Sequence, residues 1–339
     1  MLKCYLASLL HLKRGGVINV ETVLIIVLTL FLAQASLSAE ETDNVLSTGK
    51  EMDQTFNNLL VPKEFLNLLF RDCNQCFVFL VELQTQTAFL IDFQKEPYAL
   101  SIIREFEISS GKQKGAKRSE LDLRTPLGFY EIAQYRASKT LEKKFGPGAY
   151  VLNYPNHLDR IEKKTGSGIW IHGNDRINFI DYDSEGCIRL KNDELPLLQD
   201  YLTPRTSPVI IVQKIEWLDL DNLLTMKNEF QERHDGWLSS WQNNNLEEYL
   251  SYYHPSFYNP DNNLDITRWS LHKRDISINN PPLFISINDL LIIYTENKIV
   301  VRGEQHYRTT TFSDVGMKRV LWHDTDEGWF IVREDWQPG

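Results

Sequence analysis

The chain has 339 residues, 42% of them hydrophobic, which is enough material for two ordinary domains. Its net charge is -10, and because three basic and one acidic side chain give the first 39 residues a charge of +2, the remainder carries -12. Such an acidic chain lacks the basic stripe that nucleic-acid binding requires, so we expect no nucleic-acid partner.

Residues 1–39 have the form of an export signal. A basic head precedes an apolar core from Val23 to Leu32, and Ala-Gln-Ala at 33–35 has the form of a cleavage site. The alternative is an uncleaved anchor, although the apolar run is shorter than the ~20 residues of a spanning helix. We therefore expect an exported protein, periplasmic or in the cell envelope, that meets the membrane only through this segment.

The remaining chain divides into three parts by pattern. Residues 40–74 are polar and then helical in pattern, and residues 75–217 are rich in apolar strands. A hairpin is expected from Phe77–Glu82 and Ala88–Phe93. Further strands are expected at 101–108, 128–134, 149–152, 168–172 and 208–214, with one short helix at 192–202. Many strands with brief helices predict a mostly-β domain.

Residues 218–339 have a different texture and hold six of the eight tryptophans. A first helix is indicated by an aromatic stripe at helical spacing: Phe230, His234, Trp237 and Trp241. Asn245 has the form of a helix cap, and Pro255 is expected to end that second helix. Strand alternation begins near Leu283. Two helices followed by antiparallel strands predict a cone-shaped α+β domain with most of the aromatics in its core.

Cysteine usage leaves one thiol without an obvious structural role. Cys73 and Cys76 form a C-x-x-C pair, which in an oxidising compartment favours a local disulfide, with free thiols and redox chemistry as alternatives. The sequence offers no second ligand pair at zinc spacing. Cys187 is then a lone thiol in an exported chain and a candidate nucleophile.

The stretch around Cys187 carries the clearest chemistry. A cysteine attacks as its thiolate and needs a base, which His172, at the end of an apolar strand, can supply. Gly186 permits close backbone approach and is a candidate oxyanion donor, with Ser184 capping the turn. Arg189 is a candidate for binding a substrate carboxylate.

Two other interpretations of this stretch remain open. Cys187 and His172 are also compatible with ordinary buried structural roles. A metal site of His172, Asp181, Asp183 and Cys187 would combine one thiolate with mainly oxygen ligands, which suits zinc poorly. We expect no metal and no cofactor.

The order of these residues resembles the signature of the L,D-transpeptidase catalytic domain (YkuD type): His-Gly, then Ser-x-Gly-Cys-Ile-Arg. Upstream segments at Gly111-Lys112, Lys117, 124–130, 152–156 and 166–173 are similar to other motifs of that family, over roughly residues 75–214. The resemblance implies a β-rich fold with Cys187 as nucleophile and His172 as base. It also implies substrate contacts from Arg189, Gly173, Tyr154 and Asn156.

Members of this family cut the bond between the L-centre of diaminopimelate and the terminal D-alanine of peptidoglycan stems, through a thioester. An amine acceptor then gives a cross-link, and water gives a shortened stem. Many members have histidine before the Gly-Cys pair, where this chain has Glu185. The resemblance therefore implies that the base is His172 alone and that Glu185 influences the acceptor or the local pKa.

The tail resembles a nuclear-transport-factor-2-like domain, and the domain order is similar to the cell-shape L,D-carboxypeptidases. This implies hydrolysis of tetrapeptide to tripeptide, with peptidoglycan stem peptides and glycan as partners. The alternatives are a 3-3 cross-linking L,D-transpeptidase, an amidase that releases wall-linked lipoprotein, and a non-catalytic wall-binding scaffold. Glycan or stem is expected to bind tail aromatics such as Trp269 or Tyr258. The sequence leaves the oligomeric state open.

Overall fold

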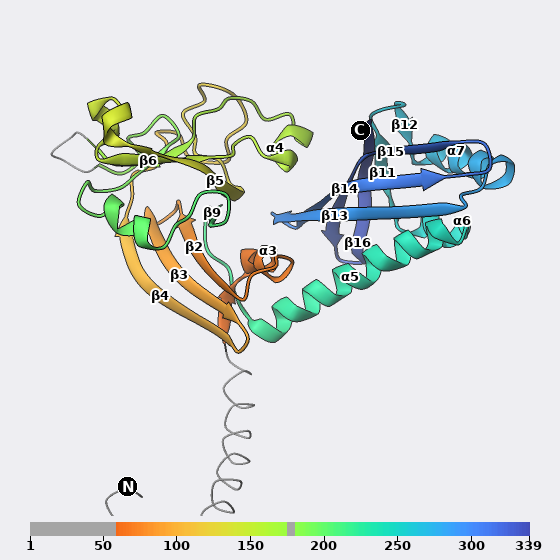
Figure 1. Cartoon of the computed structure of the whole chain (residues 1–339), viewed down its shortest axis with the longest axis horizontal. Coiled ribbons are helices and arrows are strands. Elements are labelled where there is room, and N and C mark those ends of the chain that lie inside the picture. Colours follow the sequence, from red (N-terminus) through yellow and green to blue (C-terminus); the bar gives the residue numbers. More distant parts are fainter. Residues whose placement is uncertain (1–58, 175–179) are drawn as a thin grey trace, which may run out of the picture. The chain divides into compact units, whose positions relative to one another are not determined.

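The computed structural model describes residues 59–174 and 180–339 (Figure 1). The expected export signal at 1–39 and the helical segment up to residue 58 lie outside the described residues. The described part of that segment forms strand β1 (Leu60–Pro62), a 3-10 turn (Lys63–Phe65) and the one-turn helix α3 (Leu66–Leu69). Within the described ranges, no helix combines the length and apolar character needed to cross a membrane.

The first large sheet has eight strands in the order β4-β3-β2-β9-β5-β6-β7-β8. Their bounds are β2 Gln75–Glu82, β3 Thr87–Lys95, β4 Tyr98–Glu107, β5 Gly128–Ala137, β6 Gly148–Leu152, β7 Trp170–His172, β8 Ile188–Arg189 and β9 Pro208–Val212. The five expected strands and the expected hairpin all fall on strands of this sheet. Its pairings are antiparallel except β2 with β9 and β7 with β8.

Strand β2 explains why its sequence is apolar without alternation. Val78 and Leu80 belong to one hydrophobic cluster, and Phe79 and Val81 belong to another. Both faces of this central strand are therefore covered, and a strand buried on both sides has no polar face.

Helices are brief in this half of the chain. Helix α4 spans His157–Ile161. The helix expected at 192–202 is instead a 3-10 helix, Leu195–Asp200, with a proline in its first turn. Proline supplies no N–H, and the short segment closes with i→i+3 bonds rather than a full α-helical ladder.

The second sheet has six strands in the order β12-β11-β16-β15-β14-β13. Its strands are β11 Tyr253–Asn259, β12 Leu264–Asp265, β13 Phe284–Thr295, β14 Lys298–Arg308, β15 Ser313–Thr325 and β16 Gly328–Pro338. The helices that accompany it are α5 Leu220–Gln242, α6 Leu246–Ser251 and α7 Ile266–Asn279. A short strand, β10 (Trp217–Asp219), pairs with β1 just before α5. The expected order of a mostly-β domain followed by an α+β domain is confirmed.

Two expectations for the α+β domain need correction. Helix α7 was not anticipated, so the domain has three described helices where two were expected. Pro255 lies inside β11 rather than ending a helix. The pairing of β11 with β16 is irregular between Tyr253 and Tyr258, and a proline is tolerated where the ladder is interrupted.

The aromatic stripe of α5 forms the core of the α+β domain, as expected. Phe230 and Trp237 are buried, and both rings meet Trp322 of β15 edge-on at centroid distances of 5.7 and 6.1 Å. The N-terminal segment joins the same core through α3. The Asn67 side chain accepts from the Tyr294 N–H at 2.7 Å and donates to the Tyr294 carbonyl at 3.0 Å.

Candidate active site

Two neighbouring parallel strands bring His172 and Cys187 together. Strand β8 begins directly after Cys187 and pairs with β7 so that Ile171 lies opposite Ile188 and His172 lies opposite Arg189. Side chains alternate along a strand and match across a parallel pair, so His172, Arg189 and Cys187 project to one side. Ile171 and Ile188 fill the buried core on the other side.

The turn before Cys187 is held by Ser184. The Ser184 hydroxyl donates to the Cys187 carbonyl and accepts from the Gly186 N–H at 3.0 Å. Gly186 has a φ of +125°, and a Cβ there would lie 2.8 Å from the Arg124 carbonyl oxygen, so a side chain does not fit. The Gly186 N–H is therefore engaged within the turn, and its role as an oxyanion donor stays a prediction.

The backbone carbonyl of the next residue, Gly173, orients the His172 ring. Nδ1 lies 2.6 Å from the Gly173 carbonyl, so in the neutral ring Nδ1 carries the proton and Nε2 has the basic lone pair. The ring also meets Phe145 edge-on at 5.0 Å. A Cβ on Gly173 would lie 2.3 Å from Asn192 Oδ1. Gly173 thus orients the histidine, and it is not one of the residues that line the cavity described below.

The Cys187 thiol lies in surroundings that favour its neutral form. Burial raises the pKa of the thiol above its ordinary value, and this outweighs the lowering by the Trp170 N–H, Arg189 and Lys117. The Glu185 carboxylate raises it further. The thiol donates to the Gly168 carbonyl at 3.5 Å. A thiol of this kind needs a base at the moment of attack.

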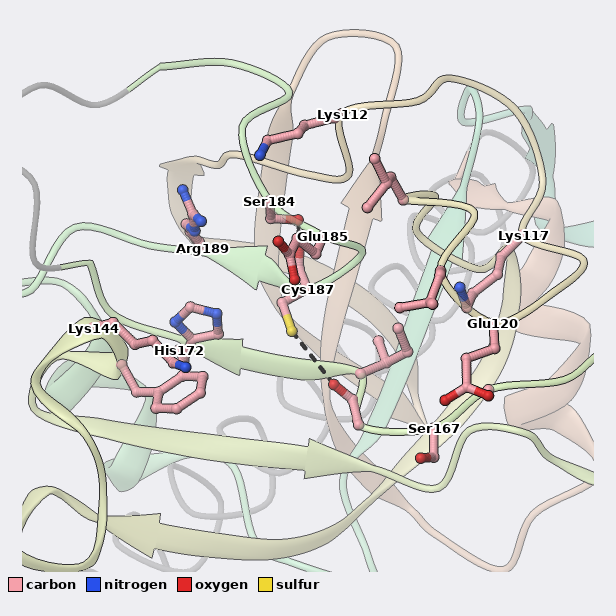
Figure 2. Close-up of a pocket in the computed structure, with 16 residues that line it drawn as sticks. Lys112, Lys117, Glu120, Lys144, Ser167, His172, Ser184, Glu185, Cys187 and Arg189 are labelled. Atoms are coloured by element: carbon pink, nitrogen blue, oxygen red, sulfur yellow. Dashed lines mark hydrogen bonds between the residues drawn. The ribbon is translucent and has the colours of Figure 1, made fainter.

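The thiol and the imidazole open into one cavity of about 490 Å³ (Figure 2). Its lining combines four basic residues, two glutamates, two leucines and the segment before β7: Lys112, Lys117, Glu120, Leu121, Leu123, Lys144, Phe145, Gly166, Ser167, Gly168, Ile169, His172, Ser184, Glu185, Cys187 and Arg189. Arg189 also pairs with Asp183 at 3.0 Å. The cavity is large enough for part of a peptide.

Two of the expected substrate contacts lie elsewhere. Asn156 caps helix α4, where its side chain accepts from the Asp159 N–H, and its amide donates to the Phe129 carbonyl at 2.9 Å. Tyr154 is buried and donates to the Thr165 carbonyl at 3.1 Å. Neither lines the cavity. The structure gives both residues structural contacts, and their assignment to substrate binding stays a prediction.

One wall of the cavity is a loop folded around Asp122. The carboxylate accepts from the N–H groups of Arg118, Ser119 and Arg124 and pairs with the Lys117 ammonium at 2.7 Å. Burial alone would raise the pKa of Asp122, but the Lys117 hydrogen bond and the three N–H groups lower it to about 2. The loop thereby holds Leu121, Leu123 and Glu120 at the cavity.

Sequence patterns pointed to part of this lining. Lys112 and Lys117 belong to upstream motifs that resemble the family, but neither was assigned a role. Lys144 and Phe145 lie in a one-turn 3-10 helix (Lys143–Phe145) and Glu120 lies in a loop, and neither segment has a characteristic sequence pattern. Among the described residues, no three His, Cys, Asp or Glu side chains gather as metal ligands would.

The α+β domain has a second cavity, of about 420 Å³. Trp241, Trp269 and Trp336 line it together with Lys273, whose ammonium lies 4.4 Å from the centre of the Trp269 ring. Burial lowers the pKa of Lys273 to about 8. Of the two aromatics expected to bind ligand, Trp269 lines this cavity, while Tyr258 is exposed and does not.

Comparisons with known proteins agree with this geometry. Residues 77–211 match the model of the L,D-transpeptidase catalytic domain (YkuD), and residues 229–335 match that of the Cds6 C-terminal NTF2-like domain. A search of curated protein sequences finds no match. Bd1075 of Bdellovibrio bacteriovorus is similar in structure, with a TM-score of 0.59, 23% identity, and coverage of 83% of this chain and 99% of that one.

The helical cell shape determining protein Pgp2 of Campylobacter jejuni is similar to the same extent. Its structure gives a TM-score of 0.60 and 23% identity, and the match covers 80% of this chain and 98% of that one. At this level of identity the two likenesses establish a shared two-domain fold.

Proposed function

We propose that this chain, in which an L,D-transpeptidase catalytic domain precedes an NTF2-like domain, is an envelope L,D-carboxypeptidase with a role in cell shape. It would cleave the diaminopimelate–D-alanine bond of peptidoglycan stem tetrapeptides and release the tripeptide. The observation that carries the proposal is the placement of Cys187 and His172 on one side of two paired strands, facing one cavity.

The proposed acylation uses both residues. His172 Nε2 takes the thiol proton, and Sγ attacks the carbonyl carbon of the scissile amide. The imidazolium then returns that proton to the leaving amine, and D-alanine departs from a thioester on Cys187. Among the described residues, the Cys187 N–H makes no hydrogen bond, whereas the Gly186 N–H donates to Ser184. We therefore propose the Cys187 N–H as a donor to the developing oxyanion.

Deacylation decides between the two outcomes of this chemistry. Water gives up a proton to His172 and attacks the thioester carbon, which frees the tripeptide carboxylate and restores the thiol. An amine competes with water only if the enzyme binds and orients it. Arg189 and Lys144 lie on the His172 side of Cys187 (Figure 2), and these cations do not attract a protonated amine. We therefore expect hydrolysis to exceed cross-linking.

Product analysis tests this directly. Protein from residue 40 onward is incubated with tetrapeptide muropeptides, and the products are separated by chromatography and identified by mass spectrometry. Free tripeptide and D-alanine in equal amounts are expected. A product mixture of mainly 3-3 cross-linked dimers would make the enzyme a transpeptidase instead.

The NTF2-like domain would hold the wall polymer through its cavity. The half-buried Trp336 lines that cavity, and an indole face suits a sugar or peptide surface. Trp336→Ala should reduce activity on intact wall several-fold and activity on muropeptides by less than twofold. Tyr258→Ala, on an exposed ring outside the cavity, is the matched control. Equal losses on both substrates would argue against a polymer-holding role.

A further inference from the structure

The catalytic cavity separates its charges around the thiol. Figure 2 shows Arg189, Lys144 and His172 on one side of Cys187, and Glu120, Ser167 and Lys117 on the other. Lys117 is paired with Asp122. The cavity therefore has a cationic side next to the base and an acidic group on the opposite side.

Glu120 keeps a fixed place because its backbone contacts the segment that leads into β7, the strand that carries His172. The Glu120 N–H donates to Thr165 Oγ1 at 3.1 Å, and the Thr165 N–H donates to the Arg118 carbonyl at 3.1 Å. Gly166 packs so closely that a Cβ would lie 3.3 Å from the Glu120 Cα. Two residues further on, the Gly168 carbonyl accepts from the Cys187 thiol.

The cation nearest to Glu120 is already occupied. Lys117 is 3% exposed and is bonded to the Asp122 carboxylate and the Ser119 carbonyl. The Glu120 carboxylate itself is exposed and makes no ion pair or hydrogen bond with any described residue. Glu120 is therefore a carboxylate that no described cation neutralises, and it lies on a hydrogen-bonded segment of the cavity wall.

The direction of the substrate follows from the chemistry at the thiol. The leaving amine must lie next to His172, which protonates it, so D-alanine and its carboxylate occupy the cationic side. The diaminopimelate residue, on the other side of the scissile carbonyl, then extends away from His172. Its side chain ends in an ammonium and a carboxylate, and Glu120 lies on this side of Cys187.

We infer that Glu120 binds the distal ammonium group of the diaminopimelate side chain, so that the enzyme selects stems in which this amine is free. This inference rests on the proposed function. The proposed function does not say how the diaminopimelate side chain is recognised, and the inference assigns that contact. In a cross-linked wall the distal amine of each acceptor stem is an amide and carries no charge. Acceptor stems would therefore be poor substrates.

Binding to a catalytically silent enzyme tests the inference without turnover. Calorimetry on Cys187→Ala compares a tetrapeptide stem with one in which hydrogen replaces the distal amino group, which removes the charge without adding bulk. We expect the second stem to bind about five- to tenfold more weakly, as for one charge-assisted hydrogen bond in a partly solvated site. In Cys187→Ala/Glu120→Gln the two stems should bind within about twofold of each other.

Two matched variants make the result specific. Glu105→Gln changes an exposed carboxylate on β4 and should preserve the full difference between the two stems. Glu185→Gln removes the other glutamate of the cavity. The inference is overturned if Glu120→Gln leaves the difference intact, if Glu185→Gln abolishes it, or if neither stem binds.

Product analysis with wild-type enzyme distinguishes a failure of the Glu120 inference from a failure of the proposed function. Discrimination between the stems without any tripeptide or dimer product would leave Glu120 as an ammonium site in a protein that lacks the proposed activity. Conversely, tripeptide formed at equal rates from both stems would support the carboxypeptidase and remove the role of Glu120.

Discussion

At the scale of single residues, the site combines a thiol that resists ionisation with a base held in one tautomer. Burial raises the pKa of Cys187, so little thiolate is present at neutral pH without help. The Gly173 carbonyl fixes the proton of His172 on Nδ1. Reactivity should therefore depend on proton transfer between the two residues rather than on a standing thiolate.

Cys187→Ala should abolish turnover and leave the circular dichroism and melting temperature close to those of the wild type. His172→Ala should slow thiol alkylation about tenfold or more near pH 7, and the gap should narrow at alkaline pH, where the thiol ionises unaided. The measurement is the alkylation rate against pH. Equal rates at pH 7 would show that His172 does not activate the thiol.

Asp122 gives a second residue-scale prediction, with a defined pH window. Its pKa is lowered from 3.8 to about 2, so its carboxylate contributes about 2 kcal/mol of stability that is present above pH 4 and lost as the pH falls through 2. Asp122→Asn should lower the melting temperature at pH 5–7, and the difference should vanish toward pH 2. Asp193→Asn, on an exposed carboxylate, is the control. A difference that persisted at pH 2 would contradict this electrostatic origin.

The sequence led to Cys187 and His172 because their chemistry lies in one short motif beside a recognisable apolar strand. It did not lead to Glu120, because that residue is held at the cavity by a hydrogen bond to the Thr165 hydroxyl and by packing against Gly166, both distant in the sequence. The hydrogen bond of the Gly186 N–H could not be predicted for a similar reason. A glycine in a turn suggests an open N–H, but only the folded turn shows that Ser184 uses it.

At the scale of elements, the sequence predicts the strands and helices that have a regular apolar pattern, such as α5. It does not predict helix α7, which lacks such a pattern. Helix α5 has an aromatic stripe that only a helix can bury. In α7 the one buried side chain is Trp269, and Leu271 and Ile278 are exposed, so no apolar face marks the helix. Its start is fixed by a polar contact instead, since the Asp265 side chain accepts from the Arg268 N–H at 2.9 Å.

The disulfide between Cys73 and Cys76, at the start of β2, leads to a prediction about the oxidation state of the three described cysteines. The structure joins Cys73 to Cys76 in a disulfide and leaves Cys187 as a thiol. Alkylation of exported protein without reductant should therefore label one cysteine, measured by intact mass. Three labels would mean that the pair is reduced, and a disulfide that includes Cys187 would indicate redox control of the nucleophile.

At the scale of the whole molecule, the order of a mostly-β and an α+β domain followed from the change in residue pattern near Trp217. The contacts between distant segments could not be predicted from the sequence, because side chains that pack across domains leave no periodic pattern in it. One hydrophobic cluster includes Phe93 of β3, Phe65 beside α3 and Trp237 of α5. Truncation after β9 would therefore expose core surface, and point variants are the sounder probes of the second domain.

The bond between Asn67 and Tyr294 has a consequence for solubility. Strand β13 is the last strand of its sheet, and an open strand edge is a template on which another chain can add. The Asn67 amide occupies both the N–H and the carbonyl of Tyr294, so at this residue it satisfies the edge as a neighbouring strand would. Asn67→Ala should leave the N–H and carbonyl of Tyr294 unpaired on the edge and cause self-association that rises with protein concentration, measured by light scattering. The variant Asn279→Ala, at the end of α7, should stay monodisperse under the same conditions.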